Sequence, residues 1–121
     1  MKLNAIFVLP IMNVHLIKKQ TLEDYIRKNA RSKPSFNIWY ALIKRSNWEK
    51  PADIICTFNT ADLIGNGSER VVFNIGGNKY RLICTYHFGV QNVHLFIKWI
   101  GTHAEYSKLC KENSQYSVSS F

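Results

Sequence analysis

The segment RVVFNIGGNKYRLICTYHF, residues 70–88, constrains the fold more than any other part of the sequence. Two runs of alternating apolar and polar residues flank Gly76-Gly77-Asn78. Alternation is typical of strands that bury one face, and glycine and asparagine tolerate the positive φ angles of a tight turn. The segment therefore predicts a β-hairpin.

The alternation also predicts which side chains of the hairpin share a face. One face is mostly apolar and is expected to point inward, toward helices: it holds Val71, Phe73, Ile75, Tyr80, Leu82, Cys84 and Tyr86. The opposite face is expected to point outward, and its polar members are Arg70, Asn74, Lys79, Arg81 and His87.

A third alternating run, from Val93 to Ile100, follows a turn at residues 89–92. Three such strands in succession predict an antiparallel meander. The stretch from Arg70 to Ala104 contains no acidic residue. A basic sheet surface without carboxylates can approach phosphate groups without repulsion.

A helix is predicted to begin at His103, because Thr102 and Glu105 have the spacing of a capping box. His103 and Tyr106 are three residues apart and therefore share a helix face. The N-terminus of a helix offers free N–H groups and the positive end of its dipole, which suits an anion. This setting also favours a neutral imidazole, which can accept a proton at pH 7.

The N-terminal half of the chain predicts one strand and two helices. Residues 14–19 alternate as a strand, and Thr21 can cap a first helix with Leu22, Tyr25, Ile26 and Ala30 on one face. Residues 32–35 form a break, after which Ser35 can cap a second helix. The apolar stripe of this helix is typical of a core, and it consists of Phe36, Trp39, Tyr40 and Ile43, widened by Ile38 and Leu42.

The second helix ends in Lys44 and Arg45, which are interpreted as a solvated face, as a contact for RNA or an acidic partner, or as both. Residues 51–69 are rich in loop-forming residues, and so long a stretch predicts a short turn of helix or a mobile loop. Residues 1–11 are interpreted as an N-terminal extension outside the native domain or an added edge segment, rather than a targeting signal. Residues 12–112 are expected to form a single domain, followed by a polar tail, residues 113–121, that frays.

The charge balance indicates a polyanionic partner. Sixteen Lys and Arg residues against eight Asp and Glu residues give a net charge of +8. Such a charge favours nucleic acid, an anionic membrane or an acidic protein. The sequence contains no phosphate-binding glycine motif of a nucleotide-dependent enzyme, and we expect no cofactor.

Three cysteines, Cys56, Cys84 and Cys110, lie far apart, without the spacing of a zinc site or a disulfide framework. They are interpreted as reduced, packed thiols of a cytoplasmic protein, and no metal site is expected.

Two motifs carry a resemblance to a known family. RVVFNIGGNKYRLI followed by WIGTHAEY resembles the HigB-type toxins of bacterial toxin–antitoxin systems, which are small basic mRNA interferases related to the RelE-like toxins. MNVHLIKKQTLEDYIRKN also resembles the N-terminus of that family, with a start methionine at Met12. The resemblance extends from Met12 to Lys111.

The resemblance implies a RelE-like α+β fold with two N-terminal helices packed on a twisted antiparallel sheet and a short C-terminal helix. It implies ribosome-dependent cleavage of translated mRNA and neutralisation by a HigA-type helix-turn-helix antitoxin. The matching positions are Asn74, Gly77, Asn78, Arg81, His103 and Tyr106. Of these, the glycine and Asn78 are assigned to the turn, and Arg81, His103 and Tyr106 to function.

Metal-free RNA cleavage requires groups that move protons and a cation that stabilises the charged phosphorane. We predict Arg81, His103, Tyr106 and Lys79 as catalytic residues, with Arg81 holding phosphoryl oxygens through its planar guanidinium. The predicted RNA-binding residues are Arg70, Asn74, Lys98, Lys44 and Arg45. The motif region has no cluster of carboxylates, which disfavours a two-metal nuclease.

Three other functions remain as alternatives. The same sheet can serve as a non-catalytic module that binds RNA or an antitoxin. An RRM-like sheet is less well supported, because its exposed face would require paired stacking aromatics. Membrane binding would require a basic amphipathic helix, whereas the aromatic faces here suit a core.

Overall fold

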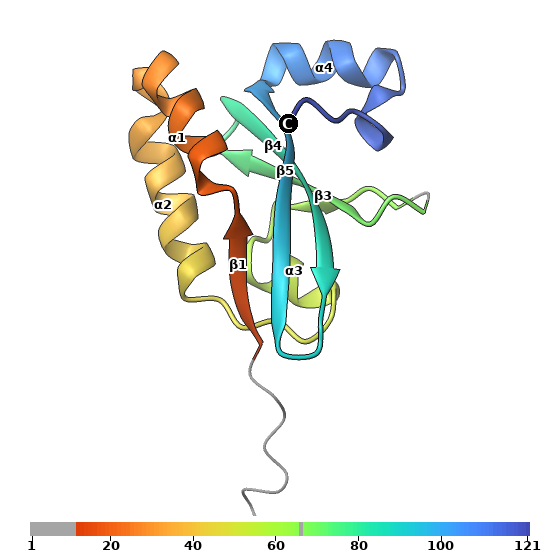
Figure 1. Ribbon diagram of the computed structural model, residues 1–121. Helices are drawn as coiled ribbons and strands as arrows, with labels where there is room; N and C mark the ends of the chain where they lie inside the picture. Colours follow the sequence, from red (N-terminus) through yellow and green to blue (C-terminus); the bar gives the residue numbers. More distant parts are fainter. Residues whose placement is uncertain (1–11, 66) are drawn as a thin grey trace, which may run out of the picture.

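The predicted hairpin forms the centre of a five-stranded sheet in the computed structural model, which describes residues 12–65 and 67–121 (Figure 1). Its strands are β3, Arg70–Ile75, and β4, Tyr80–Phe88, paired antiparallel as predicted. The order of strands across the sheet is β1-β5-β4-β3-β2. The short strand β2, Asp62–Leu63, lies at one edge, beside β3.

The predicted meander is confirmed, and its third strand is longer than expected. Strand β5, Asn92–Thr102, pairs antiparallel with all nine residues of β4. The register shifts between Ile83 and Cys84, which pair with Trp99 and Ile97. Lys98 is therefore the additional residue of a β-bulge.

The sheet is mixed, which corrects the expectation of an antiparallel sheet. Strand β1, Asn13–Ile17, pairs parallel with β5, with Val14 opposite Val93 and His15 opposite His94. The alternation of residues 14–19 predicts a strand but carries no information about its neighbour. Because helices and three other strands separate β1 from β5 in the chain, β1 can run in either direction beside it.

Two helices, α1, Lys19–Lys28, and α2, Lys33–Lys44, lie against one face of the sheet (Figure 1). Phe36, Trp39 and Ile43 of α2 are buried in the core as predicted. The ring centroids of Trp39 and Phe73 are 5.2 Å apart in an edge-to-face arrangement. Ile38, expected to widen the apolar stripe, is instead 66% exposed.

The predicted caps of α1 and α2, Thr21 and Ser35, are both wrong. Lys18 adopts a left-handed conformation with φ 59°, which turns the chain out of β1, so α1 begins before Thr21. A 3₁₀ turn, η2, Ala30–Ser32, leads directly into α2. Pro34 lies in the first turn of α2, where its missing N–H removes no helical hydrogen bond, and Ser35 is therefore inside the helix.

The irregular stretch at residues 51–69 contains the short turn of helix that its length predicted. This helix, α3, is Ala52–Thr57, and its Ile54 is buried. Trp48, also buried, donates from its indole Nε1 to the Thr57 hydroxyl at 2.9 Å. These contacts hold α3 at the edge of the core.

The opposite face of the sheet is covered in part, and the tail does not fray as the sequence predicts. Helix α4, His103–Lys111, and the 3₁₀ turn η3, Ser114–Tyr116, lie on that side (Figure 1). Arg70 donates to the carbonyl oxygens of Gln115 and Val118 at 3.3 and 2.7 Å. The Ser120 N–H donates to the Lys98 carbonyl oxygen at 2.9 Å, so the tail packs on the domain.

The cysteines differ in their surroundings. Cys84 is buried in the sheet as expected, whereas Cys56 on α3 is exposed and Cys110 is partly buried. All three are free thiols. Within residues 12–65 and 67–121, none of the helices has the length and apolar character needed to cross a membrane.

Two positions on α2 test this packing. Phe36 is fully buried, so Phe36→Ala is expected to lower the free energy of unfolding by about 3–5 kcal/mol. Ile38→Ala, on the exposed side of the same helix, should change it by less than about 0.5 kcal/mol. Urea unfolding followed by circular dichroism measures both values. Similar losses in the two variants would contradict the placement of α2.

Candidate functional site

Arg81 lies at the centre of a hydrogen-bonded cluster on the outward face of β4. It is opposite Asn74 in β3 and Gly101 in β5, and only 7% of it is exposed. Its Nη2 donates to the Asn78 Oδ1 at 2.7 Å and lies 2.9 Å from the Nδ1 of His103. Its Nη1 donates to the Tyr80 carbonyl oxygen at 3.0 Å. The guanidinium is therefore held in a defined orientation.

His103 reaches Arg81 because β5 ends beside the start of β4. Thr102 is opposite Tyr80, and the His103 N–H donates to the Lys79 carbonyl oxygen at 2.9 Å. The guanidinium carries only donors, so the Nδ1 of His103 accepts this hydrogen bond and its proton is on Nε2. The His103 side chain is otherwise exposed. The His103 imidazole therefore contacts the buried Arg81 guanidinium on one side and solvent on the other.

The predicted capping box at the start of α4 is confirmed. The Glu105 N–H donates to the Thr102 hydroxyl at 3.2 Å, and the Thr102 N–H donates to the Glu105 Oε1 at 2.8 Å. The box places a carboxylate at this helix end and uses the Glu105 N–H, while the His103 N–H donates to the Lys79 carbonyl oxygen. The end of the helix is thus less open to an anion than the sequence predicts, and Arg81, which contacts His103, supplies a positive charge beside it.

Tyr106 packs between the indole of Trp99 and the guanidinium of Arg81. Its ring centroid is 6.1 Å from that of Trp99 and 6.0 Å from the Arg81 Cζ. Burial, followed by a hydrogen bond with Cys110, raises the pKa of Tyr106 well above its usual value. The phenol therefore keeps its proton at neutral pH and acts there as a hydrogen-bond donor.

Gly101 makes this close packing possible. A Cβ atom at this position would lie 2.4 Å from the Cη2 of Trp99 and 2.8 Å from the Glu105 Oε1. Both distances are far below van der Waals contact, so a larger residue would displace the indole or the carboxylate. The glycine thus lets Trp99 lie across β5, next to Tyr106.

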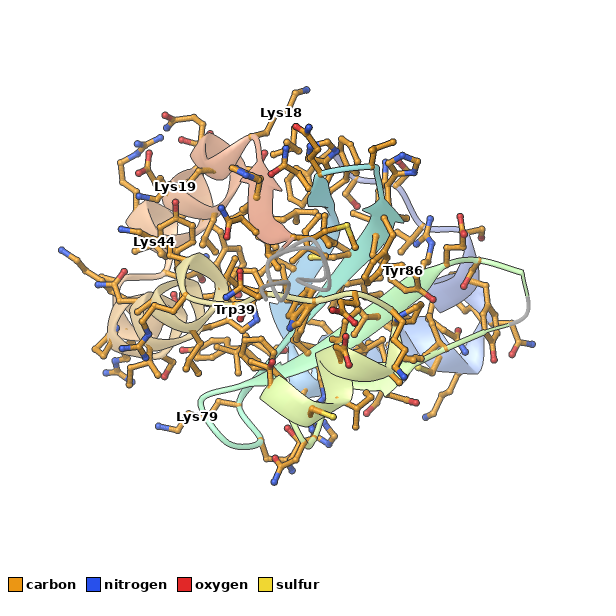
Figure 2. All side chains as sticks on the ribbon, turned by 90° about the horizontal axis from the view of Figure 1, so that it is seen from below. Lys18, Lys19, Trp39, Lys44, Lys79 and Tyr86 are labelled. Atoms are coloured by element: carbon orange, nitrogen blue, oxygen red, sulfur yellow. The ribbon has the colours of Figure 1, made fainter. Side chains whose placement is uncertain are left out.

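Lys79 is the fourth residue that the sequence assigns to the reaction. It lies in the hairpin turn, and its side chain extends away from the protein (Figure 2). Its backbone is fixed by the hydrogen bond from His103. The structure thus brings Arg81, His103 and Tyr106 into one cluster and leaves the Lys79 ammonium at its margin.

The five residues predicted to bind RNA do not form one surface. Asn74 lies beside Arg81 and donates to the Thr60 carbonyl oxygen at 3.3 Å. Arg70 is 7% exposed and its guanidinium is held by the tail. Lys98 is partly buried at the bulge. Lys44 and Arg45 are exposed at the C-terminal end of α2, which packs against the opposite face of the sheet.

Sequence reasoning missed the contribution of Asn78 and of Gly101. The sequence assigns Asn78 to the turn alone, yet its side chain accepts a hydrogen bond from Arg81. Its position between a double glycine and the second strand explains the assignment, since asparagine is common in turns. Gly101 directly precedes the capping box, and a glycine in that position could have indicated close packing at the start of the helix.

The site does not contain a ligand set for a metal. Among the residues that the structure describes, no group of three or more His, Cys, Asp or Glu side chains is arranged to hold a metal ion. The cluster around Arg81 instead combines a cation, an imidazole and a neutral phenol. These groups can bind an anion and move protons.

Comparison with known proteins gives a consistent result. Residues 32–109 match the model of a family described as the HigB toxin, a RelE-like toxic component of a toxin–antitoxin system. The mRNA interferase HigB of Escherichia coli O6:H1 is 30% identical over 98 residues, which cover 81% of this chain and 93% of that protein. The mRNA interferase toxin HigB of Escherichia coli K12 is 28% identical over 93 residues, with coverages of 77% and 88%.

The raised pKa of Tyr106 predicts the titration behaviour of the tyrosines. In the unfolded chain Tyr106 ionises near pH 10, whereas the folded protein keeps its proton to higher pH. The group thus favours unfolding as the pH rises above about 10. Tyr106→Phe should leave the tyrosinate absorbance of the folded protein near pH 10 unchanged and lower that of the denatured protein by one tyrosine. A loss of amplitude in the folded protein would contradict the burial of this phenol.

Proposed function

The chain belongs to the HigB family of RelE-like toxins, the toxic components of toxin–antitoxin systems, and we propose that it cleaves translated mRNA on the ribosome. The relatives in Escherichia coli and Shigella flexneri are named as mRNA interferases, that is, endoribonucleases. The protein is accordingly an endoribonuclease toxin whose substrate is mRNA and whose partner is an antitoxin. The observation that supports the reaction best is the hydrogen bond between Arg81 and His103.

Arg81 binds the scissile phosphate. A guanidinium has five N–H groups, of which three donate to Asn78, Tyr80 and His103. The other two N–H groups donate to phosphoryl oxygens of the bound RNA. The N–H group that donates to His103 in the absence of RNA joins them. Because the cation is preorganised and largely shielded from water, it stabilises the additional negative charge of the transition state effectively.

The reaction is an internal transfer within the RNA. The 2′-oxygen attacks the neighbouring phosphorus, forming a pentavalent phosphorane, and the bond from phosphorus to the 5′-oxygen then breaks. The 2′-hydroxyl gives up a proton, and the leaving 5′-oxygen takes one up. The products are a 2′,3′-cyclic phosphate and a free 5′-hydroxyl.

His103 accepts the proton of the 2′-hydroxyl. When a phosphate takes over the Arg81 N–H group, the Nδ1 lone pair of His103 is released and is available as a base. Either Tyr106, which is protonated at neutral pH, or Lys79 delivers a proton to the 5′-oxygen. These steps require no metal ion.

The RNA follows the basic side of the sheet next to this cluster. Asn74 and Lys98 lie on or near the outward face of the meander, where residues 70–104 include no carboxylate. Lys44 and Arg45 are on the helical side, where they suit an additional contact with ribosomal RNA. Arg70 is excluded from this surface, because its guanidinium is used by the tail.

The proposal includes two macromolecular partners and a location. Cleavage takes place in the ribosome, which presents the mRNA to the cluster around Arg81. A helix-turn-helix antitoxin of the HigA type neutralises the toxin, and both act in the cytoplasm. The competing function is a non-catalytic module of the same fold that binds RNA or the antitoxin without cleavage.

Substitutions at Arg81 and His103 test the reaction. Loss of a positioned acid, base or charge stabiliser costs on the order of 10² to 10⁴ in rate, so Arg81→Ala and His103→Ala should abolish growth arrest. Inducible expression with mapping of transcript 5′ ends measures arrest and cleavage together. Both variants should still fold and bind the antitoxin.

Two control variants match these substitutions. Arg27→Ala removes an exposed arginine of α1, and Ser107→Ala changes an exposed residue of α4. Both should arrest growth as the wild type does. Wild-type toxicity of both site variants at equal expression would reject this reaction centre and support the non-catalytic module.

The metal-independent chemistry is tested in a purified translation reaction. Phenanthroline, which binds transition metals and leaves the magnesium of the ribosome in place, should not change the rate of mRNA cleavage. The same mRNA without ribosomes should be cleaved far more slowly. Inhibition that is reversed by added zinc would contradict the first expectation, and equal cleavage of free mRNA would contradict the second.

A further inference from the structure

Three of the four histidines lie outside the cluster around Arg81 and stand side by side across the sheet. His94 of β5 is in register with His15 of β1 on one side and with His87 of β4 on the other. We call His15, His94 and His87 the histidine row. The parallel pairing of β1 with β5 creates it, so nothing in the linear sequence indicated it.

The rings of the histidine row form a continuous aromatic surface. The centroids of His87 and His94 are 6.3 Å apart with 9° between their planes, and those of His15 and His94 are 6.2 Å apart with 55° between theirs. Phe96 extends the surface, with its ring centroid 6.5 Å from that of His94. The Nε2 of His15 is 3.0 Å from the Oδ1 of Asn92, which holds the outer ring.

This aromatic surface is on the face of the sheet that points away from α1 and α2. The residues that alternate with it, Val93 and Leu95, are fully buried in the core. His15 and His87 are exposed, and Phe96 is 38% exposed, which is unusual for a phenylalanine on a sheet. Solvent thus has access to aromatic rings that no described residue covers fully.

Cations lie beside the rings. Phe96 shares a hollow of about 270 Å³ with Lys18 and Lys98. The Lys18 side chain extends into solvent (Figure 2). The strands β4 and β5 that carry most of the row contain no acidic residue. Aromatic rings next to free cations match the two components of single-stranded RNA, its bases and its phosphates.

We propose that the histidine row and Phe96 bind unpaired bases of single-stranded RNA by stacking, outside the reaction centre. The proposal rests on the proposed function in taking RNA as the ligand. His94 and Phe96 supply the stacking surface, and Lys18 and Lys98 contact the backbone phosphates next to it. Since every base has a π-face, the surface accepts different sequences.

The geometry of the row favours a stacking surface over a metal site. A metal requires imidazole nitrogens that converge on one point, whereas the rings of His87 and His94 are stacked nearly parallel, and no three His, Cys, Asp or Glu side chains of the described residues are arranged to hold a metal ion. The rings of adjacent strands are spaced by the sheet itself. A nucleobase is large enough to cover more than one of them.

The surface is too far from Arg81 to hold the nucleotides that react. His87 and Arg81 lie on the same face of β4, six residues and therefore about 20 Å apart. Between them, the tail crosses this face at Arg70 and Lys98. The histidine row thus contacts RNA several nucleotides away from the cleaved bond and contributes to affinity, with no part in the proton transfers.

The experiment measures binding of a short single-stranded oligonucleotide with 2′-O-methyl riboses, which the proposed reaction cannot cleave. The full chain is titrated into the labelled oligonucleotide, and fluorescence anisotropy reports the dissociation constant. His94→Leu and Phe96→Leu, which remove a ring and keep an apolar side chain, should each weaken binding about fivefold or more. His94→Tyr and Phe96→Tyr, which keep a ring, should bind within about twofold of the wild type.

Val90→Ala is the matched control. It removes exposed apolar surface from the neighbouring turn, where Val90 is 90% exposed, and should leave the affinity unchanged. Thermal unfolding of each variant verifies that it is folded. Equal affinities of the leucine and tyrosine variants would overturn the proposal, as would an equal loss in Val90→Ala.

The mRNA cleavage assay on the same wild-type preparation separates the two proposals. Cleavage by the wild type, with oligonucleotide affinity insensitive to the leucine variants, rejects the stacking surface and leaves the proposed function intact. Ring-dependent binding by a wild type that cleaves no mRNA retains the stacking surface and rejects the nuclease.

Discussion

The pairing of β5 with β4 is the constraint on which the rest of the structure depends. It places Thr102 opposite Tyr80 and Gly101 opposite Arg81, so the start of α4 lies against the turn of the hairpin. The hydrogen bond from the His103 N–H to the Lys79 carbonyl oxygen joins the two segments directly. Arg81 is on β4 and His103 is on α4, and this register is what brings their side chains within hydrogen-bond distance. The absence of a side chain at Gly101 is what lets Trp99 and Glu105 pack at the same point.

The buried arginines show two ways in which this fold accommodates a cation. Arg70 donates to carbonyl oxygens of the tail, and in return it holds the tail against the sheet. Arg81 donates to Asn78, Tyr80 and His103, and one of these partners is an imidazole that reaches solvent. Hydrogen bonds offset part of the cost of burying a charge, and the acceptors that each of these two guanidinium groups uses are neutral. Neutral acceptors leave the positive charge of Arg81 available to an incoming anion.

The outward face of the sheet is thereby divided into separate regions. The cluster around Arg81 occupies one end, the tail crosses the middle, and the histidine row lies toward the other end. The family match ends at residue 109, before the tail begins. The cluster around Arg81 thus lies within the matched region, and the tail that crosses the sheet lies beyond it.

The amino-acid sequence alone determined the local elements. The hairpin around Gly76-Gly77, the third strand, the apolar face of α2 and the capping box at Thr102 all follow from side-chain alternation, helical spacing or turn chemistry, and the structure agrees with each of them. The sequence also shows the resemblance to HigB-type toxins, because the motifs that carry the resemblance lie in these elements. The first residues of α1 could not be predicted in the same way, because no sequence pattern indicates that Lys18 adopts a left-handed conformation.

Only the tertiary structure decided which of these elements meet. The parallel placement of β1, the coverage of Arg70 by the tail and the contact of Asn78 with Arg81 depend on residues that are far apart or on side-chain directions within a turn. Alternation assigns a residue to a face and leaves open what covers that face, so Arg70 and Arg81 looked equally exposed. The histidine row arises for the same reason, because strand order, which no local pattern encodes, places His15, His94 and His87 abreast.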